Sequence, residues 1–565
     1  MKTSFRKIRW IALLAAATTS AAFAGDTVFV NAKIFTGNTL QPYAEAVAIH
    51  DDRIVAVGSE TEVRAAAAAG ASVVDMKGRT LLPGMIDSHA HPVMAGLWLG
   101  FAWTDDAMKK ADQVGKVALA ALKGGKSMRS DVLEIHGISL SVWSQEDRLN
   151  AIFNHGAFAK VPVFLQGMDG HTGWANQLLR TRAGITTEYL KSLPEDKRKY
   201  FGHDKNMVPS GFGVDKGLDQ IVDHLPDASP ETMLTAGRLA VKTMHEWGIT
   251  GWLDALASRS IIATYKDLSD RHELNTHVAA LVQVKAGEAD PLANVNALRH
   301  EFANVPGLTI PGIKIFMDGV VEFPSQSAAM SKPYAVTGKV GDLLFTPAEF
   351  ASVATQADKA GLLVHVHSIG DLATTTALDG FAAMRKANGN SGLQHTITHL
   401  QFVQPADFDR FKALDVIASV QLLWANAGED TIDIVKPYVD PQLYPWQYPA
   451  RSMLDAGATM AGASDWPVST ANPFEAIYEA ETRKGTKGVL NADQAMPRTA
   501  MLYAYTINAA KVLNQQKTIG SIEAGKQADF ALVDRDVMTV SPERLKDTKV
   551  LGTMVDGQWV FGGVR

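Results

Sequence analysis

The middle of the chain alternates short apolar runs with longer segments of helical periodicity, and this alternation most constrains its fold. "VPVFLQ", "GIKIFMDG", "GLLVHVHSIGD", "VIASVQLL" and "TMAGASD" are typical of buried strands, whereas "PETMLTAGRLAVKTMHEWG" and "TPAEFASVATQADKAG" have helical spacing. Strands that alternate with helices predict a parallel sheet, and 565 residues suffice for an α/β fold built on a (β/α)8 TIM-like barrel. A doubly wound sheet is the alternative, but no G-x-G-x-x-G follows a strand to mark a dinucleotide site.

The segments on either side of this α/β middle are rich in short β-branched runs. "TVFVNAKIFTG" and "AEAVAIHDDRIVAVG" lie near the start, and "ADFALVDRD" and "VLGTMVDGQWVFGG" lie near the end, where Asp556-Gly557 indicates a hairpin turn. We therefore expect a small β-sandwich domain formed by both termini. The predicted boundaries are 25–83 and 510–565 for this domain and 84–509 for the barrel, with an insertion at about 101–249.

Residues 1–24 have the pattern of a secretory signal peptide. Four basic residues precede a short apolar run, which ends in Ala22-Phe23-Ala24. A membrane anchor is the alternative, but the run is shorter than the roughly 20 residues that a span needs. The pattern predicts export to the periplasm, and no membrane association after cleavage, because no later segment offers a span.

Charge and cysteine content exclude several partners and sites. Cleavage after Ala24 would change the formal charge from −6 to −10, since the leader carries four basic and no acidic residues. A nucleic-acid partner is therefore not expected. The chain has no cysteine, so it can form neither a disulfide nor a thiolate metal site. Any metal must be bound by His, Asp, Glu or a modified Lys.

Three pairs of histidines end strand-like runs. They occur in "GMIDSHAHP", "VHVHSIGD" and "QHTITHLQ" and are His89 and His91, His365 and His367, and His395 and His399. Within each pair the spacing places both side chains on one face of an extended segment. A single such histidine can be a satisfied core residue, but three pairs among 16 histidines favour a metal site at the strand ends. The spacing alone does not choose between the two members of the second and third pairs.

Lys314 and Asp465 also occupy strand-like positions. Lys314 lies between apolar neighbours in "GIKIFMDG", where a buried amine must be paired, as with Asp318, or chemically altered. Reaction with CO2 would convert it to an anionic carbamate that can bridge two metals. Asp465 in "AGASDWP" follows an apolar run. Beside the histidines it could bind a metal and accept a proton, and the structural alternative is that it caps a helix or forms a turn.

The order of these residues resembles the amidohydrolase superfamily. The motifs are "GRTLLPGMIDSHAHP", "IKIFMDG", "VHSIGD", "GASDWPV" with "NPFEAI", and "GSIEAGKQADFALVD", and they extend over essentially the whole chain after the leader. Their details are similar to the branch of N-substituted formamide deformylases and exoenzyme regulators.

The resemblance implies a two-metal site. One divalent ion would be bound by His89, His91 and Asp465, and a second by His367 and His399, with carboxylated Lys314 as the bridge. The ligand set suits two Zn2+ ions, with manganese, iron or cobalt as alternatives. Two departures concern Thr398, where relatives carry an acidic residue, and "VEFPSQSA", which is bulkier and more polar than the corresponding loop.

The implied chemistry is hydrolysis of a C–N bond in a small amide, N-acyl or N-formyl substrate. A metal-bridging hydroxide would attack the carbonyl, and Asp465 would act as general base and then general acid. A dipeptidase-like or ester hydrolase and a non-catalytic binding or regulatory protein are the alternatives. The retention of all six ligands argues against the last. The chain is also compatible with a homo-oligomer.

Candidate substrate-binding residues lie mainly in the predicted insertion. "QGMDGHTGWANQ" contains Asp169 and His171, which resemble a DGH element of relatives, and Trp143 lies upstream. We expect His171 to contact the substrate or stabilise an oxyanion, with a buried hydrogen-bonded turn as the structural alternative. Asp318 is a further candidate, and the tryptophans of this region weakly favour an aromatic or acyl-bearing substrate.

Overall fold

Eight parallel strands form the central sheet of the protein, which is described here by a computed structural model. The structure describes residues 26–105 and 107–564, so the predicted signal peptide lies outside the described residues. The strands, in spatial order, are β8 (Met85–Ala90), β16 (Ile249–Asp254), β17 (His277–Gln283), β18 (Leu308–Phe316), β19 (Leu363–Ser368), β20 (His395–His399), β21 (Val416–Val420) and β22 (Met460–Gly462). Every neighbouring pair is parallel, which confirms the predicted barrel.

The two edge strands, β8 and β22, lie against each other and nearly close the barrel. The Ser88 hydroxyl donates a hydrogen bond to the Gly462 carbonyl at 2.8 Å. Just beyond the strands, the Asp465 amide donates to the His89 carbonyl at 2.8 Å, and the His91 amide donates to the Trp466 carbonyl at 2.9 Å. These bonds hold the segment after β22 beside the end of β8.

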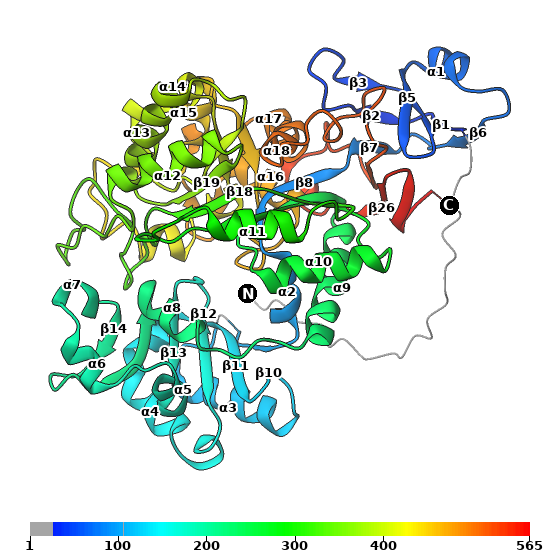
Figure 1. Ribbon diagram of the computed structural model, residues 1–565. Coiled ribbons are helices and arrows are strands. Elements are labelled where there is room, and N and C mark those ends of the chain that lie inside the picture. Colours follow the sequence, from blue (N-terminus) through cyan, green and yellow to red (C-terminus); the bar gives the residue numbers. More distant parts are fainter. Residues whose placement is uncertain (1–25, 106, 565) are drawn as a thin grey trace.

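Helices follow the barrel strands and cover the outside of the sheet (Figure 1). Ser229 caps α9 (Pro230–Glu246) and Thr346 caps α12 (Pro347–Lys359), each by accepting a hydrogen bond from the backbone amide three residues ahead. Both helices have proline at the first position, which suits a helix start. Within the described part of the chain, every helix is too short or too polar to cross a membrane.

Strands from both ends of the chain share a six-stranded sheet beside the barrel, seen as blue and red ribbons in Figure 1. Its order is β27 (Gln558–Gly562), β26 (Val550–Val555), β25 (Phe530–Val533), β7 (Thr80–Pro83), β2 (Lys33–Phe35) and β3 (Tyr43–Ala44). A second sheet contains β5 (Arg53–Gly58), β4 (Ala46–His50), β1 (Asp26–Val30) and β6 (Ser72–Asp75). Phe29 of the smaller sheet and Phe530 of the larger belong to one buried apolar cluster. That the two sheets form a separate β-sandwich domain stays a prediction.

A separate α/β unit, the inserted unit, interrupts the barrel after its first strand and lies below it in Figure 1. Its sheet contains β9 (Ala102–Trp103), β10 (Met128–Arg129), β11 (Val132–Ile138), β12 (Val163–Gly167), β13 (Thr172–Ala175), β14 (Phe201–His203) and β15 (Pro209–Val214). The run "VPVFLQ" therefore belongs to this sheet and not to the barrel, because an apolar run does not reveal which sheet it joins. The helix α9, at the end of the predicted insertion, packs against α2 (Pro92–Leu99) of the barrel.

Candidate metal centre

Five of the predicted ligands converge at the carboxyl ends of the barrel strands. His89 lies in β8 with His91 just after it, His367 lies in β19, His399 ends β20, and Asp465 follows β22. The ligand atoms of His89, His399 and Asp465 all lie within 4.8 Å of one another. The ring centroids of His367 and His399 are 4.5 Å apart. The parallel barrel thus brings together residues that are distant in the sequence.

Asp465 lies at the centre of this group. Its Oδ1 is 3.3 Å from His89 Nε2 and 3.1 Å from His91 Nε2. Its backbone has φ +56°, a left-handed conformation that is uncommon for a residue other than glycine. Such a conformation persists only where the surroundings fix it. Here the hydrogen bond from the Asp465 amide to the His89 carbonyl does so. The carboxylate is therefore held in a defined place between the two imidazoles.

The surroundings favour the neutral form of the His89, His367 and His399 imidazoles. Burial holds the pKa of His89, His367 and His399 well below the ordinary value, and neighbouring imidazoles and the Lys314 amine lower it further. Burial raises the pKa of Asp465, but the hydrogen bond with His91 and the electrostatic effect of the neighbouring histidines and Lys314 lower it by more. Neutral imidazoles beside an ionised carboxylate are the protonation states in which these side chains bind a divalent ion.

Lys314 lies fully buried beside this group. Its side chain is 0% exposed, and its Nζ has no hydrogen-bond partner among the residues that the structure describes. The nearest described interaction is with the ring of Phe316, whose centroid is 4.8 Å from Nζ. Burial lowers the pKa of the amine to about 7, against the opposing charge of Asp465. A buried amine without a partner is costly unless its charge or chemistry changes.

A glutamine just after the next strand, β21, orients His399. The His399 Nδ1 is 3.1 Å from Gln421 Oε1, and the Gln421 amide donates to Thr398 Oγ1 at 3.2 Å. The His399 ring also stacks on Trp424, with centroids 5.6 Å apart. Because the amide oxygen accepts a hydrogen bond from Nδ1–H, the lone pair of His399 lies on Nε2, where it can bind a metal ion. Gln421 thus joins His399 to Thr398 through its side-chain amide.

The remaining histidines of the three pairs have different surroundings. His365 Nε2 is 2.6 Å from His89 Nδ1, and its Nδ1 is hydrogen-bonded to Thr396 Oγ1. His365 therefore orients a predicted ligand. His395 pairs with Asp358 at 2.9 Å, at the start of β20 and thus at the opposite end from His399. That His367 and His399 are the ligands of their pairs stays a prediction.

The inserted unit contributes His171 to the metal centre. The ring centroid of His171 is 5.3 Å from that of His367, and His171 Nδ1 donates to Asp215 Oδ1 at 2.8 Å. Burial disfavours the charged ring, but the hydrogen bond and charge of Asp215, with Asp169 and Asp465, raise its pKa to about 9. Asp169 accepts hydrogen bonds from the backbone and hydroxyl of Thr172 and shapes the turn.

Two other predicted substrate residues occupy structural positions. Trp143 is 3% exposed within the apolar core of the inserted unit, and its Nε1 donates to Thr172 Oγ1. Asp318 is fully buried and accepts three backbone hydrogen bonds, from Ala329, Ile369 and Gly370. That either residue contacts the substrate stays a prediction, although Asp318 Oδ1 lies 3.8 Å from His367 Nε2. The sequence could not separate an aromatic core residue from a pocket residue, or a loop-organising carboxylate from a binding one.

A carboxylate that the sequence did not single out faces Gln401, two residues after His399. Glu322 lies in the polar "VEFPSQSA" segment, is partly exposed, and accepts a hydrogen bond from Gln401 Nε2 at 3.0 Å. Burial raises its pKa to about 7, and the charge of Asp169 of the inserted unit adds to this effect. Glu322 is therefore a polar group at the same face of the barrel as the candidate ligands.

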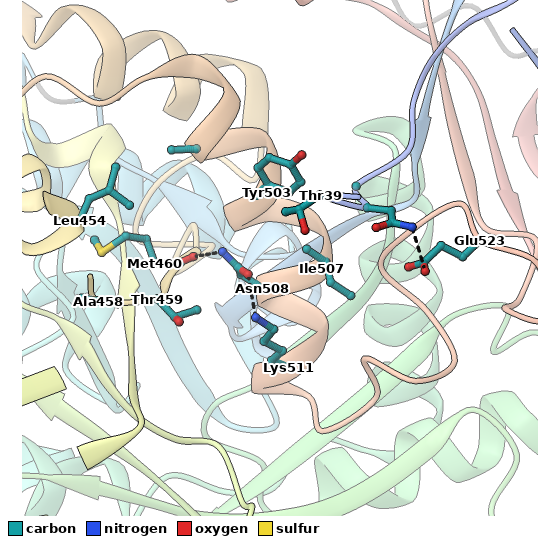
Figure 2. A pocket seen from close by; sticks show the side chains of 13 residues that line it. Thr39, Leu454, Ala458, Thr459, Met460, Tyr503, Ile507, Asn508, Lys511 and Glu523 are labelled. Carbon is teal, nitrogen blue, oxygen red and sulfur yellow. Dashed lines mark hydrogen bonds between the residues drawn. The ribbon is translucent and has the colours of Figure 1, made fainter. Parts of the chain in front are cut away.

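A cavity of about 390 Å³ lies away from the metal centre (Figure 2). Its lining includes Thr459 and Met460, at the start of β22, together with Thr39 and Glu523 from the terminal segments. Asp465 lies beyond the other end of β22. The cavity therefore belongs to the opposite face of the barrel.

Several known proteins are similar to this chain in sequence or in fold. The model of the amidohydrolase family matches residues 72–561. The chain is 26% identical to N-substituted formamide deformylase of Arthrobacter pascens, over 94% of this chain and 97% of that protein. It is 28% identical to exoenzymes regulatory protein AepA of Pectobacterium carotovorum subsp. carotovorum, over 70% of this chain and 84% of AepA.

A solved structure supports the architecture. An uncharacterized metal-dependent hydrolase from Pyrococcus horikoshii superposes with a TM-score of 0.72 at 22% identity. The match covers 92% of this chain and 99% of that one. The fold described above is therefore one that a solved structure also adopts.

Proposed function

Because this chain belongs to the amidohydrolase family, we propose that it is a metal-dependent hydrolase of a C–N bond in a small amide, N-acyl or N-formyl compound. Membership confirms the resemblance inferred from the sequence motifs. The observation that carries the proposal is the convergence of His89, His399 and Asp465, whose ligand atoms lie within 4.8 Å of one another. The formamide deformylase relative supports an N-acyl or N-formyl substrate.

The donor set fits divalent metal ions. We assign His89, His91 and Asp465 to one ion and His367 and His399 to a second. Nitrogen and oxygen donors without sulfur suit zinc and permit manganese, iron or cobalt. The proposed bridge is carboxylated Lys314, because its amine is buried without a hydrogen-bond partner among the described residues and its pKa is lowered to about 7. A neutral amine can attack CO2 to form the N–C bond of a carbamate, with release of a proton.

Bound divalent ions would lower the pKa of a coordinated water and polarise a carbonyl oxygen. Asp465 is placed to move the proton, since its lowered pKa keeps the carboxylate ionised at neutral pH. It would accept a proton from the attacking water and deliver it to the leaving nitrogen. His171, with a pKa raised to about 9, would donate a hydrogen bond to the substrate carbonyl or to the oxyanion that forms from it.

Glu322 and Gln401 offer a recognition element for the nitrogen side of the substrate. One hydrogen bond from Gln401 leaves acceptor positions on the Glu322 carboxylate. A substrate N–H group would satisfy one of them. This contact would favour secondary amides over esters, which have no such donor.

The predicted leader supports export to the periplasm as part of the proposal. N-terminal sequencing of the secreted protein tests it. A first residue near Gly25 is expected, and Met1 would contradict cleavage.

Turnover by the purified protein tests the function. We would load it with Zn2+ or Mn2+, measure bound metal, and compare 4-nitroformanilide, 4-nitroacetanilide and 4-nitrophenyl acetate, with chelator-treated protein as the control. Metal-dependent cleavage of an anilide supports the proposal. Cleavage of the ester alone would favour the ester hydrolase alternative. If the protein bound no metal and cleaved none of the probes, a binding or regulatory protein would be favoured. The name of AepA suggests a regulatory function for that relative.

A further inference from the structure

We propose that Asp215 is a positioning residue that holds His171 beside the candidate metal ligands, so that the inserted unit completes the active site. The inference rests on the proposed function and extends it to a residue outside the barrel. Asp215 lies between β15 (Pro209–Val214) and α8 (Lys216–Val222), 44 residues after His171.

Two hydrogen bonds join Asp215 to His171. The imidazole Nδ1 donates to the Asp215 carboxylate at 2.8 Å, and the Asp215 amide donates to the His171 carbonyl at 3.0 Å. The first bond keeps a proton on Nδ1, because a carboxylate only accepts, and it fixes the rotation of the ring. The second ties together the two backbones that carry the pair. The other ring nitrogen, Nε2, is then left for a substrate group.

The backbone at Asp215 has an unusual conformation that helix capping does not explain. Its φ of +46° and ψ of −112° lie outside the regions that a residue other than glycine ordinarily adopts. Asp215 occupies the N-cap position of α8, where an aspartate commonly accepts a hydrogen bond from the helix, yet its side chain makes no such bond. The carboxylate bonds to His171 instead. Unusual backbone conformations of this kind concentrate at functional sites.

Asp215 also meets the barrel loop that faces the candidate ligands. An added Cβ at Gly319 would lie 2.9 Å from Asp215 Oδ2, so only glycine permits this approach. The Gly319 carbonyl is in turn 3.1 Å from His367 Nε2. The Asp215 side chain is 5% exposed, against 19% for His171. The carboxylate is therefore packed behind the imidazole, and the imidazole is the more accessible of the two.

The inserted unit has a second attachment to the same barrel loop, which allows the role of Asp215 to be isolated. Tyr200 donates from its hydroxyl to Asp342 at 2.9 Å, and Lys199 forms an ion pair with Asp342. Loss of the Asp215 carboxylate should leave these contacts in place. Asp342→Asn is thus the matched control, since it weakens an attachment of the inserted unit without touching His171.

A double-mutant cycle on the metal-loaded full chain, with 4-nitroformanilide as the probe, tests the proposal. We expect Asp215→Asn to lower kcat about 10- to 100-fold, because misorientation of a catalytic group costs that much, with KM changed less than about threefold. Added to His171→Ala, Asp215→Asn should cause no further loss. Asp342→Asn should keep kcat near the wild-type value. Unchanged kcat in Asp215→Asn, or losses that add in the double variant, would overturn the role.

A spectroscopic measurement decides the question even if no probe is hydrolysed, an outcome that would count against the proposed function alone. The proton between His171 and Asp215 should give a downfield proton NMR resonance. It should be absent from Asp215→Asn and His171→Ala and present in Asp342→Asn, with the circular dichroism of all variants unchanged. A spectrum of Asp215→Asn identical to that of the wild type would refute the pairing.

Discussion

Two clusters of histidine and aspartate side chains have the residue types of a metal site, but the charges around them differ. His89, His399 and Asp465 lie at the carboxyl ends of barrel strands, whereas His277, Asp529 and Asp556 lie where the start of β17 meets the terminal sheet. In each group the ligand atoms lie within 4.8 Å of one another. Residue type and spacing alone therefore do not separate them.

The neighbouring charges separate them. Burial lowers the pKa of His89 and His399, and the further imidazoles and the Lys314 amine around them lower it more, so that their lone pairs are available. His277 is buried too, but Asp529, at 2.9 Å, and Asp556 raise its pKa to about 9. The first group is the one we propose as metal ligands, and the second contains an ion pair that joins the barrel to the terminal sheet. The contrast suggests that imidazoles in excess over carboxylates mark a metal site.

The largest effect should come from Asp465→Asn. This variant removes the proton acceptor and keeps an oxygen ligand of the same size. We expect kcat to fall about 10³-fold, within the range of general acid–base catalysis, while much of the metal stays bound. Steady-state kinetics and metal analysis measure the two effects. Full activity in Asp465→Asn would remove this residue from the acid–base role.

Lys314→Ala should have the next largest effect, because it removes the proposed bridge. Loss of the partners that orient metal ligands already costs about 10- to 100-fold, so we expect at least about 100-fold here, together with loss of metal. A short-chain carboxylic acid should restore part of the activity. The exposed Lys359→Ala is the matched control. Unchanged metal content in Lys314→Ala would contradict carboxylation.

His277→Gln should affect stability and not catalysis. Breaking a buried ion pair costs about 3 to 5 kcal/mol, and we expect about 3 kcal/mol in the free energy of unfolding measured by urea. His300→Gln, at an exposed histidine, is the control. A variant that lost bound metal or kcat with its stability intact would place His277 in the catalytic machinery and break the comparison.

The same ion pair should make stability depend on pH. The pKa of His277 is about 9 in the folded protein, against an ordinary 6.5. Its contribution is therefore complete below about pH 6.5, decreases as the pH rises, and is absent above about pH 9. The difference in unfolding free energy between the wild type and His277→Gln should follow this course. A difference that grew with rising pH would contradict the ion pair.

The barrel and most of the candidate ligands were accessible from the sequence because short-range periodicity reports them. In a strand, His89 and His91 share a face whatever the surrounding chain does. The family motifs then selected His367 over His365 and His399 over His395, a choice that stays a prediction, and His365 lies against His89.

What the sequence missed depends on contacts between distant segments. "VPVFLQ" has the pattern of a barrel strand but pairs within the inserted sheet. Trp143 is aromatic as a pocket residue would be, yet it fills a core. Asp215 and Gln421 carry no motif, because each acts through a histidine far away in the sequence. Neither periodicity nor composition records such a pair.

The smallest effect on catalysis should come from Gln421, which orients a ligand and does not bind metal itself. In Gln421→Leu the Nδ1 proton of His399 loses its acceptor, and Thr398 loses its donor. We expect metal affinity and kcat/KM to fall about tenfold, at the lower end for such partners, because Trp424 still stacks on the ring. Gln421→Glu supplies a carboxylate oxygen that can still accept the hydrogen bond from His399 Nδ1, and it should keep near wild-type affinity. If both variants lost affinity equally, the side chain would be filling space, and the accepted hydrogen bond would have no part in preparing His399 as a ligand.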